Sequence, residues 1–153
     1  MFRGINSATL DGKGRVALPA RLRESLAAAA ADGKLVVTID TKHPCLLLYP
    51  LPLWELVEAK LESLPNMNPR SRTIQRLLIG HATDLEPDSA GRLLLPQKLR
   101  DYARLDKKVV LVGQGKKVEI WSEPVWEACM EDWLSDESVT ALANAQEFNE
   151  LSV

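Results

Sequence analysis

One arrangement of chemically capable side chains occurs twice in this sequence, an Asp-x-x-Gly-Arg turn. The first copy lies at residues 11–15 and the second at residues 88–92. An aspartate at the start of such a turn can bond backbone N–H groups two residues on. A glycine can take the positive φ that other residues avoid. The pattern therefore assigns the shaping of the turns to Asp11, Gly14, Asp88 and Gly91.

The arginine at the exit of each turn is not needed to make a turn. Its guanidinium is a rigid fork of N–H donors that matches the edge of guanine or a phosphate. The alternative is an Asp–Arg ion pair that only stiffens the turn. We predict that Arg15 contacts a DNA base and that Arg92 is the second choice for this role. Candidates for contacts to the DNA backbone are, in order, Lys13, Arg3, Arg21 and Arg23.

Patterns typical of catalysis or cofactor binding are missing from the sequence. It has no Walker phosphate loop and no nucleophile elbow. The segment Gly113-Gln114-Gly115 lies between two predicted strands and favours a hairpin turn over a dinucleotide-binding loop. His43 and Cys45 offer two ligands in one loop without a second pair, so we favour a turn residue near a buried thiol over a zinc site. We predict no enzyme, no cofactor and no metal.

The charge is distributed unevenly along the chain. The 153 residues hold 19 Lys and Arg against 21 Asp and Glu, a net charge of −2. Residues 1–23 carry five bases and one acid, and residues 65–81 carry three arginines and no acid. Residues 119–153 carry nine acids and no Lys or Arg. This asymmetry indicates separate surfaces: a local basic patch suited to DNA, and an acidic end that is either a solvated face or a surface that repels DNA or pairs with a neighbour.

The composition favours a cytoplasmic protein. No apolar run approaches the roughly 18 residues that span a bilayer, and the N-terminus lacks the pattern of a secretory signal. The two cysteines form no motif and are predicted to be free thiols. We therefore expect no membrane partner.

The elements around the two turns repeat as well. Thirteen residues from Asp11 match those from Asp88 at seven positions. Each copy predicts a short strand into the turn, a second short strand, a helix, two more strands and a last helix. The first of these helices is predicted to open on Pro19 or Pro96, as its first residue.

The repeat defines the predicted organisation. We predict a first half at 1–64, a linking helix at 65–80, a second half at 81–134 and an acidic, partly helical or mobile tail at 135–153. Asn68 and Pro69 look like the cap and first residue of the linking helix. Each half is too small to bury a good core alone, so the two should share one. The predicted fold class is α+β, with a shared β core, outer helices and a pseudo-twofold axis within one chain. The four tryptophans, which lie in apolar strand and helix patterns, are predicted to belong to the core.

Several stretches resemble the MraZ family over nearly the whole chain, up to about Leu134. They are Met1-Phe2-Arg3-Gly4, Leu10-Asp11-x-Lys13-Gly14-Arg15, His43-Pro44-Cys45-Leu46-x-Leu48-Tyr49-Pro50, and Gln75-Arg76-Leu77-Leu78-x-Gly80-His81-Ala82. The halves of that family are similar to AbrB-type transition-state regulators, whose homodimers interleave two hairpins in one small barrel. The resemblance therefore implies a duplicated swapped-hairpin β-barrel core.

The resemblance also implies a function. It implies a DNA-binding transcriptional regulator, acting as a repressor, of the bacterial division and cell-wall gene cluster including its own promoter. It further implies a ring-shaped homo-oligomer on the nucleoid, which should bind double-stranded DNA at direct repeats. The family's Asp-x-x-x-Arg motif falls on Asp11 with Arg15 and on Asp88 with Arg92. The second copy has Ala90 where the first has Lys13, which lowers its positive charge.

Two other functions remain open from the sequence. The first is an antitoxin-like protein of the same barrel class, whose turns bind DNA while its acidic tail binds a basic toxin. The second is an assembly protein that uses apolar helix faces to build rings and does not bind DNA. Binding to the protein's own upstream DNA at two salt concentrations discriminates between DNA binding and pure assembly.

Overall fold

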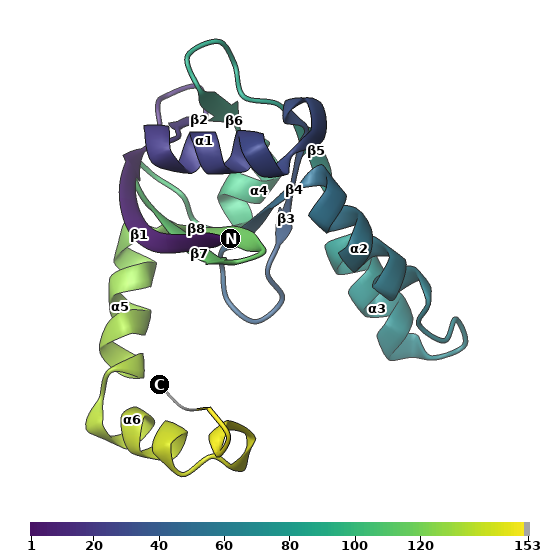
Figure 1. Ribbon diagram of the computed structural model, residues 1–153, viewed down its shortest axis with the longest axis vertical. Helices are drawn as coiled ribbons and strands as arrows, with labels where there is room; N and C mark the ends of the chain where they lie inside the picture. Colours follow the sequence, from purple (N-terminus) through teal and green to yellow (C-terminus); the bar gives the residue numbers. More distant parts are fainter. Residues whose placement is uncertain (152–153) are drawn as a thin grey trace. The chain divides into compact units, whose positions relative to one another are not determined.

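The computed structural model describes residues 1–151 as an α+β structure built on antiparallel strands (Figure 1). The chain divides into two compact units, Met1–Ser122 and a second unit that begins at Glu123. Among the described residues every strand lies in the first unit: β1 (Phe2–Thr9), β2 (Arg15–Ala17), β3 (Leu35–Ile39), β4 (Leu46–Pro50), β5 (Thr83–Leu85), β6 (Arg92–Leu94), β7 (Lys108–Gly115) and β8 (Lys117–Ser122). The predicted α+β class is confirmed.

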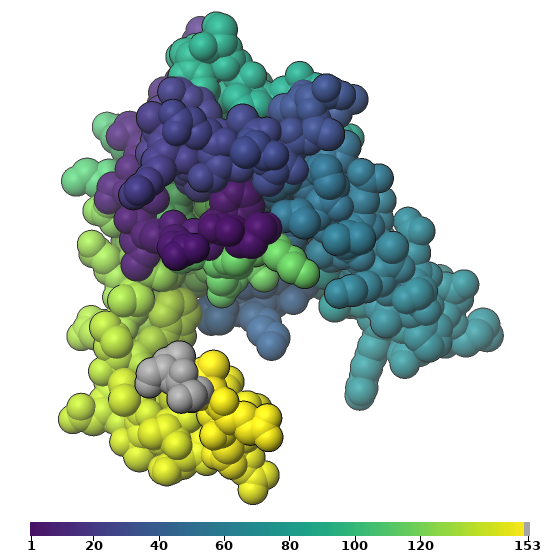
Figure 2. Space-filling view, viewed as in Figure 1, coloured from purple at the N-terminus to yellow at the C-terminus, as the bar shows by residue number. Residues whose placement is uncertain are grey.

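Six of the strands form one sheet whose order interleaves the two halves of the sequence. The order is β1–β7–β8–β4–β3–β5, and every neighbouring pair is antiparallel. Strand β1 thus pairs along its whole length with β7 of the second half, and β5 of the second half pairs with β3 of the first. Figure 2 shows the β1 segment (dark purple) packed against green residues of β7.

The register relates the two halves by a pseudo-twofold axis. Strands β2 and β6 form a separate two-stranded ribbon, in which Val16 pairs with Leu93, its counterpart in the repeat. In the larger sheet Leu47 pairs with Glu119, which is its counterpart at the offset of 72 residues. Because equivalent residues face each other at both places, the two Asp-x-x-Gly-Arg turns occupy equivalent positions on one ribbon.

The hydrophobic core draws on both halves, which explains why neither needs to fold alone. The ribbon contributes Val16 and Leu93, and the sheet contributes side chains from β3, β4, β7 and β8. On β3, Leu35, Val37 and Ile39 face this core, while Val36 faces a second cluster. Both faces of β3 and β4 are therefore covered, and every residue of these strands is buried, including Thr38, whose hydroxyl donates a hydrogen bond to the carbonyl of Leu78.

The second cluster lies under a pair of helices, α2 (Leu51–Glu62) and α3 (Pro69–Leu78). Trp54 is buried there, and Gln75 Nε2 donates a hydrogen bond to the carbonyl of Leu61 at 2.7 Å. Asn68 caps α3 by accepting a hydrogen bond from the backbone N–H of Arg70. The predicted cap and the start of the linking helix are confirmed.

The helices that follow the ribbon begin one residue later than predicted. Helix α1 spans Ala20–Ala29 and α4 spans Gln97–Tyr102. Pro19 and Pro96 are the N-cap residues because their ψ angles, 143° and 144°, are extended rather than helical. Helix α1 ends where Ala30 becomes extended, and a short 3-10 turn (Ala31–Gly33) leads into β3.

The hairpin between β7 and β8 turns later than predicted. Gln114 pairs with Lys117, so the turn consists of Gly115 and Lys116 rather than the segment 113–115. Gly113 lies inside β7 opposite β1, where an added Cβ would come within 2.4 Å of the backbone N of Arg3. The first of these glycines thus serves close strand packing, and the second serves the turn.

The second unit holds α5 (Glu123–Trp133), α6 (Asp136–Ala143) and a 3-10 turn (Gln146–Phe148). Trp126 and Trp133 are half-buried and pack edge to face, with ring centroids 5.7 Å apart. The predicted tail at 135–153, expected to be partly helical or mobile, contains α6 and this 3-10 turn, and its last two residues lie outside the described residues. None of the helices in the described chain has the length and apolar character that crossing a membrane requires.

Candidate nucleic-acid interface

Asp11 builds the first turn by accepting three hydrogen bonds. Its Oδ1 accepts from the backbone N–H groups of Lys13 (2.9 Å) and Arg15 (3.0 Å), and its Oδ2 accepts from Arg15 Nε (2.7 Å). Gly14 closes the turn by donating its N–H to the Asp11 carbonyl at 3.1 Å. The φ of Gly14 is +88°, in the left-handed region that favours glycine.

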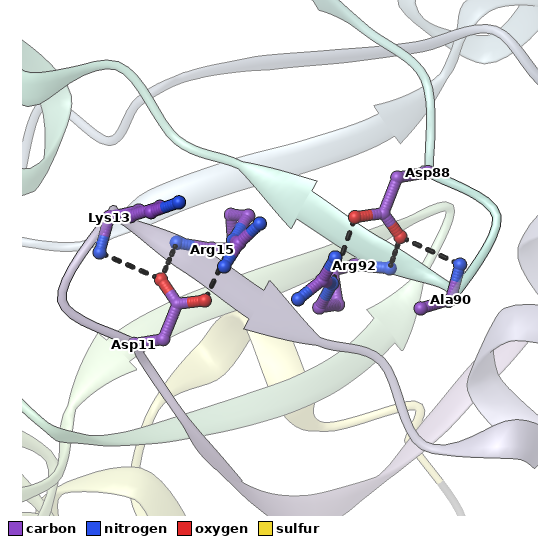
Figure 3. Close-up of polar contacts among 6 residues, drawn as sticks. All are labelled: Asp11, Lys13, Arg15, Asp88, Ala90 and Arg92. Atoms are coloured by element: carbon purple, nitrogen blue, oxygen red, sulfur yellow. Dashed lines mark hydrogen bonds and ion pairs between the residues drawn. The ribbon is translucent and has the colours of Figure 1, made fainter.

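The second turn repeats this geometry at Asp88. Its Oδ1 accepts from the N–H groups of Ala90 and Arg92, both at 2.9 Å, and its Oδ2 accepts from Arg92 Nε at 2.8 Å. Gly91 has a φ of +74°. Figure 3 shows the two turns on neighbouring strands. They match in backbone bonding and differ where the first carries the side chain of Lys13.

These hydrogen bonds stabilise the charged form of each aspartate. The backbone N–H of Arg15, helped by its guanidinium and by the N–H of Lys13, outweighs desolvation and lowers the pKa of Asp11 from 3.8 to about 2. The pKa of Asp88 is lowered for the same reason, chiefly by the backbone N–H of Arg92. Both turns are therefore held by carboxylates at neutral pH.

Acid should loosen the first turn only below about pH 4. Because the folded pKa of Asp11 lies below its unfolded value, the contribution to stability is complete above pH 3.8 and is lost as the pH falls toward 2. Asp11→Asn cannot ionise, so its melting temperature should fall less than that of the wild type over this range. Thermal denaturation at several pH values measures this difference. The control is Asp84→Asn, which changes an exposed aspartate on β5 and should give the same dependence of melting temperature on pH as the wild type. Parallel curves for wild type and Asp11→Asn would contradict the assignment.

The ribbon presents both turn arginines on one outer face. Arg15 pairs with Leu94 and Arg92 pairs with Ala17, and paired side chains of adjacent strands share a face. Arg15 and Arg92 are diagonal neighbours, a relation that puts residues roughly 7–8 Å apart. Their side chains are 28% and 35% exposed. The alternating residues are buried: Val16 and Leu93.

The Asp–Arg ion pair occupies only part of each guanidinium. Within the described part of the chain, Arg15 and Arg92 each donate a side-chain hydrogen bond through Nε alone, to their own aspartate. A guanidinium has five N–H donors, so the Nη groups remain for a bidentate contact such as that to guanine O6 and N7. The Asp–Arg ion pair, which is our alternative explanation for these arginines, is present in both turns. It orients each guanidinium through Nε and leaves the Nη groups available for a contact to DNA.

Two further arginines cover the turns, each from the opposite half. A Cβ added to Gly91 would come within 2.3 Å of Arg23 Nη1, and one added to Gly14 would come within 2.4 Å of Arg100 Cζ. Arg23 lies on α1 and Arg100 on α4, so each helix supplies a cation to the other half's turn. Sequence reasoning missed Arg100, although the repeat places it at the position equivalent to Arg23.

The remaining predicted residues divide between two places. Lys13 is exposed at the tip of the first turn, beside the ribbon. Arg3 lies near the start of β1, whereas the turn follows its end, and it lines a surface hollow of about 310 Å³ together with Arg21 and Ser25. The structure therefore brings Lys13 and Arg23 to the ribbon arginines and groups Arg3 with Arg21 elsewhere.

The structure adds functional candidates that the sequence did not indicate. Leu94 is 56% exposed on the arginine face, although it lies between two fully buried leucines; the alternation with Arg92 was the available signal. Away from the ribbon, Asp40 and Glu119 lie beside the buried thiol of Cys45, and together these three side chains could bind a metal ion. The sequence did not indicate this group because Glu119 is far from Asp40 and Cys45 along the chain.

Comparison with known proteins identifies the family. Residues 1–77 and 78–149 each match the family model described as "MraZ protein, putative antitoxin-like". The chain is 58% identical over 142 residues to the transcriptional regulator MraZ of Marinomonas sp. (strain MWYL1), covering 93% of both chains. It is 58% identical over 137 residues to the protein of that name from Coxiella burnetii (strain Dugway 5J108-111), and 54% identical over 140 residues to that from Legionella pneumophila (strain Corby), covering 90% of each chain in both cases. With two family matches that together span nearly the whole chain, and with both Asp-x-x-Gly-Arg turns intact, this chain belongs to the MraZ family.

Proposed function

We propose that this chain is a sequence-specific, DNA-binding transcriptional regulator that reads DNA with the β2–β6 ribbon. The observation that carries the proposal is the pair of part-exposed arginines, Arg15 and Arg92, held by aspartates on the outer face of a two-stranded ribbon. The major groove of DNA, about 12 Å wide, admits such a ribbon. The names of the relatives, which are transcriptional regulators and not enzymes, support this function.

Each residue of the interface has a distinct role in this proposal. Arg15 makes the principal base contact and Arg92 the second, and the exposed Leu94 can contact a thymine methyl group. Asp11 and Asp88 shape the turns and do not touch phosphate. Contacts to the DNA backbone come from Lys13 and Arg23 beside the ribbon, of which Arg23 also covers the Gly91 turn, and from Arg3 and Arg21 at the separate surface hollow, where DNA that extends beyond the ribbon would meet them.

Membership of the MraZ family supports a proposed architecture and a proposed set of targets. The interleaved strand order supports a swapped-hairpin barrel of the AbrB class, with halves at 1–64 and 81–134 and the linker at 65–80. The chain assembles head to tail into a ring on the nucleoid of the bacterial cytoplasm. It represses the division and cell-wall gene cluster, including its own promoter, at direct repeats.

Salt dependence of binding to the protein's own upstream DNA tests the proposal. If about six phosphates are contacted, the affinity should fall roughly a thousandfold between about 50 and 200 mM salt. An electrophoretic shift at both concentrations, with unrelated DNA of equal length as the control, measures this fall and the sequence preference. An absent or salt-independent shift would instead favour a ring-forming assembly protein that does not bind DNA.

A further inference from the structure

Three metal-binding side chains converge away from the arginine ribbon, at Asp40, Cys45 and Glu119. Their ligand atoms, two carboxylate oxygens and one thiol sulfur, all lie within 4.8 Å of one another. Asp40 and Cys45 bracket the loop between β3 and β4, and Glu119 lies inside β8. Because β4 is next to β8 in the sheet, the cluster joins the first half of the sequence to the second.

His43, from the same loop, is the nearest candidate for a fourth ligand, although its ring nitrogens lie outside the 4.8 Å group that Asp40, Cys45 and Glu119 form. Its Nδ1 lies 3.6 Å from Oδ2 of Asp40, and Cys45 Sγ lies 3.7 Å from the same oxygen. Ligand atoms placed about 2.0–2.3 Å from a tetrahedral Zn²⁺ are roughly 3.3–3.8 Å apart. Both measured separations fit this spacing. The ring of His43 also packs against Trp121, with centroids 5.6 Å apart, which keeps the imidazole at the cluster.

The cluster concentrates negative charge. In the part of the chain that the structure describes, no Lys or Arg forms an ion pair with Asp40 or Glu119, and the only basic partner of Asp40 is His43. Burial raises the pKa of Tyr49, and the charges of Asp40 and Glu119 raise it further, which shows that both carboxylates act on one region. A divalent cation is the group that would neutralise them.

We propose that this cluster binds one Zn²⁺ per chain through Asp40, Cys45 and Glu119, with the imidazole of His43 moving in from its place beside Asp40 as the fourth ligand. A thiol and an imidazole select zinc over Mg²⁺ and Ca²⁺, which take oxygen ligands. On binding, the thiol proton of Cys45 leaves to solvent and a zinc–thiolate bond forms. The repeat does not duplicate the site, because the counterparts of His43 and Cys45 at the offset of 72 residues are Gly115 and Lys117.

The bound ion would be structural. It ties the β3–β4 loop to β8, and so fastens the two halves of the chain close to the Leu47–Glu119 pair that marks their pseudo-twofold axis. Its ligands are outside both turns, so DNA contact and metal binding are separate properties. Loss of the metal should therefore lower the melting temperature without removing the arginines from the ribbon.

Titration of the full-length protein tests the site directly. After chelator treatment, calorimetry and metal analysis should find one Zn²⁺ per chain, and Zn²⁺ should raise the melting temperature whereas Mg²⁺ should not. Co²⁺ in place of Zn²⁺ should give the near-ultraviolet charge-transfer band of a thiolate ligand. Failure of the wild type to bind one Zn²⁺, or a Co²⁺ complex without the thiolate band, would overturn the proposal.

Variants separate this site from adventitious surface binding. Glu119→Gln preserves the size of a half-buried side chain and should weaken Zn²⁺ binding by at least about tenfold. Cys45→Ser should remove the thiolate band. Cys129→Ser, which changes the other cysteine in the second unit, is the matched control and should leave stoichiometry, affinity and spectrum unchanged. Wild-type Zn²⁺ affinity in both Glu119→Gln and Cys45→Ser would show that the ion binds elsewhere.

Discussion

Replacing Arg15 with alanine is expected to remove nearly all binding of this protein to its promoter. A lost arginine–base contact costs on the order of 1–3 kcal/mol per engaged site. In a ring that engages several sites at once, the losses multiply because each contact holds the others near the DNA. Binding to the upstream DNA, measured by anisotropy at fixed salt, should therefore fall below detection at concentrations that saturate the wild type.

The fold should survive this substitution. Asp11 keeps its hydrogen bonds from the backbone N–H groups of Lys13 and residue 15, which alanine also supplies. Only the part-exposed Nε–carboxylate contact is lost, and exposed ion pairs add little to stability. The melting temperature of Arg15→Ala should stay close to that of the wild type. A large fall in melting temperature would instead support the explanation in which Arg15 only stiffens the turn.

Two companion variants show whether the effect belongs to the turn. Arg92→Ala should weaken binding less than Arg15→Ala does. The second turn has Ala90 where the first has Lys13, so the second turn makes one phosphate contact fewer and contributes less to the affinity. Lys60→Ala removes one exposed charge from α2, outside the ribbon, and should leave affinity and salt dependence unchanged. Equal losses in the two arginine variants would show that the turns contribute alike, and unchanged binding in Arg15→Ala would exclude it as the principal base contact.

Local chemistry predicted the turns because their information is contiguous in sequence. Asp11 to Arg15 contains the acceptor, the glycine and the guanidinium, and the structure links them by short hydrogen bonds. The cap at Asn68 was predictable for the same reason. One-residue differences arose where two conformations suit one residue, as at Pro19, whose fixed φ fits both the first helical position and the N-cap.

Long-range contacts could not be derived in this way. Nothing in the apolar pattern of β1 indicates that its partner is β7, about a hundred residues away. The same limitation hid Arg100 over the Gly14 turn and Glu119 beside Cys45, since each of these pairs joins opposite halves of the chain. The repeat supplies the missing information only where an equivalent residue exists, as it does for Arg23 and Arg100 but not for Cys45.

The operator of this protein should consist of direct repeats rather than a palindrome. A symmetric dimer reads palindromes because its two reading heads face opposite ways. Here the pseudo-twofold axis lies within one ribbon, between turns that differ at Lys13 and Ala90, so identical heads must come from different chains. In the proposed ring, neighbouring chains are related by a rotation and present their ribbons in the same sense along the DNA. Each ribbon meets the same groove face if the repeats lie about 10 base pairs apart.

Changing the spacing between repeats tests the ring and the reading mode together. Inserting about half a helical turn, roughly 5 base pairs, moves the next repeat to the opposite side of the duplex and should remove most of the affinity. Inserting a full turn of about 10 base pairs restores the face and should cost less. Only a few neighbouring chains of a wide ring can meet straight DNA, so a small cluster of repeats should suffice. Footprinting of the promoter variants measures both effects. A single palindromic site, bound equally well after either insertion, would contradict both the direct repeats and the ring.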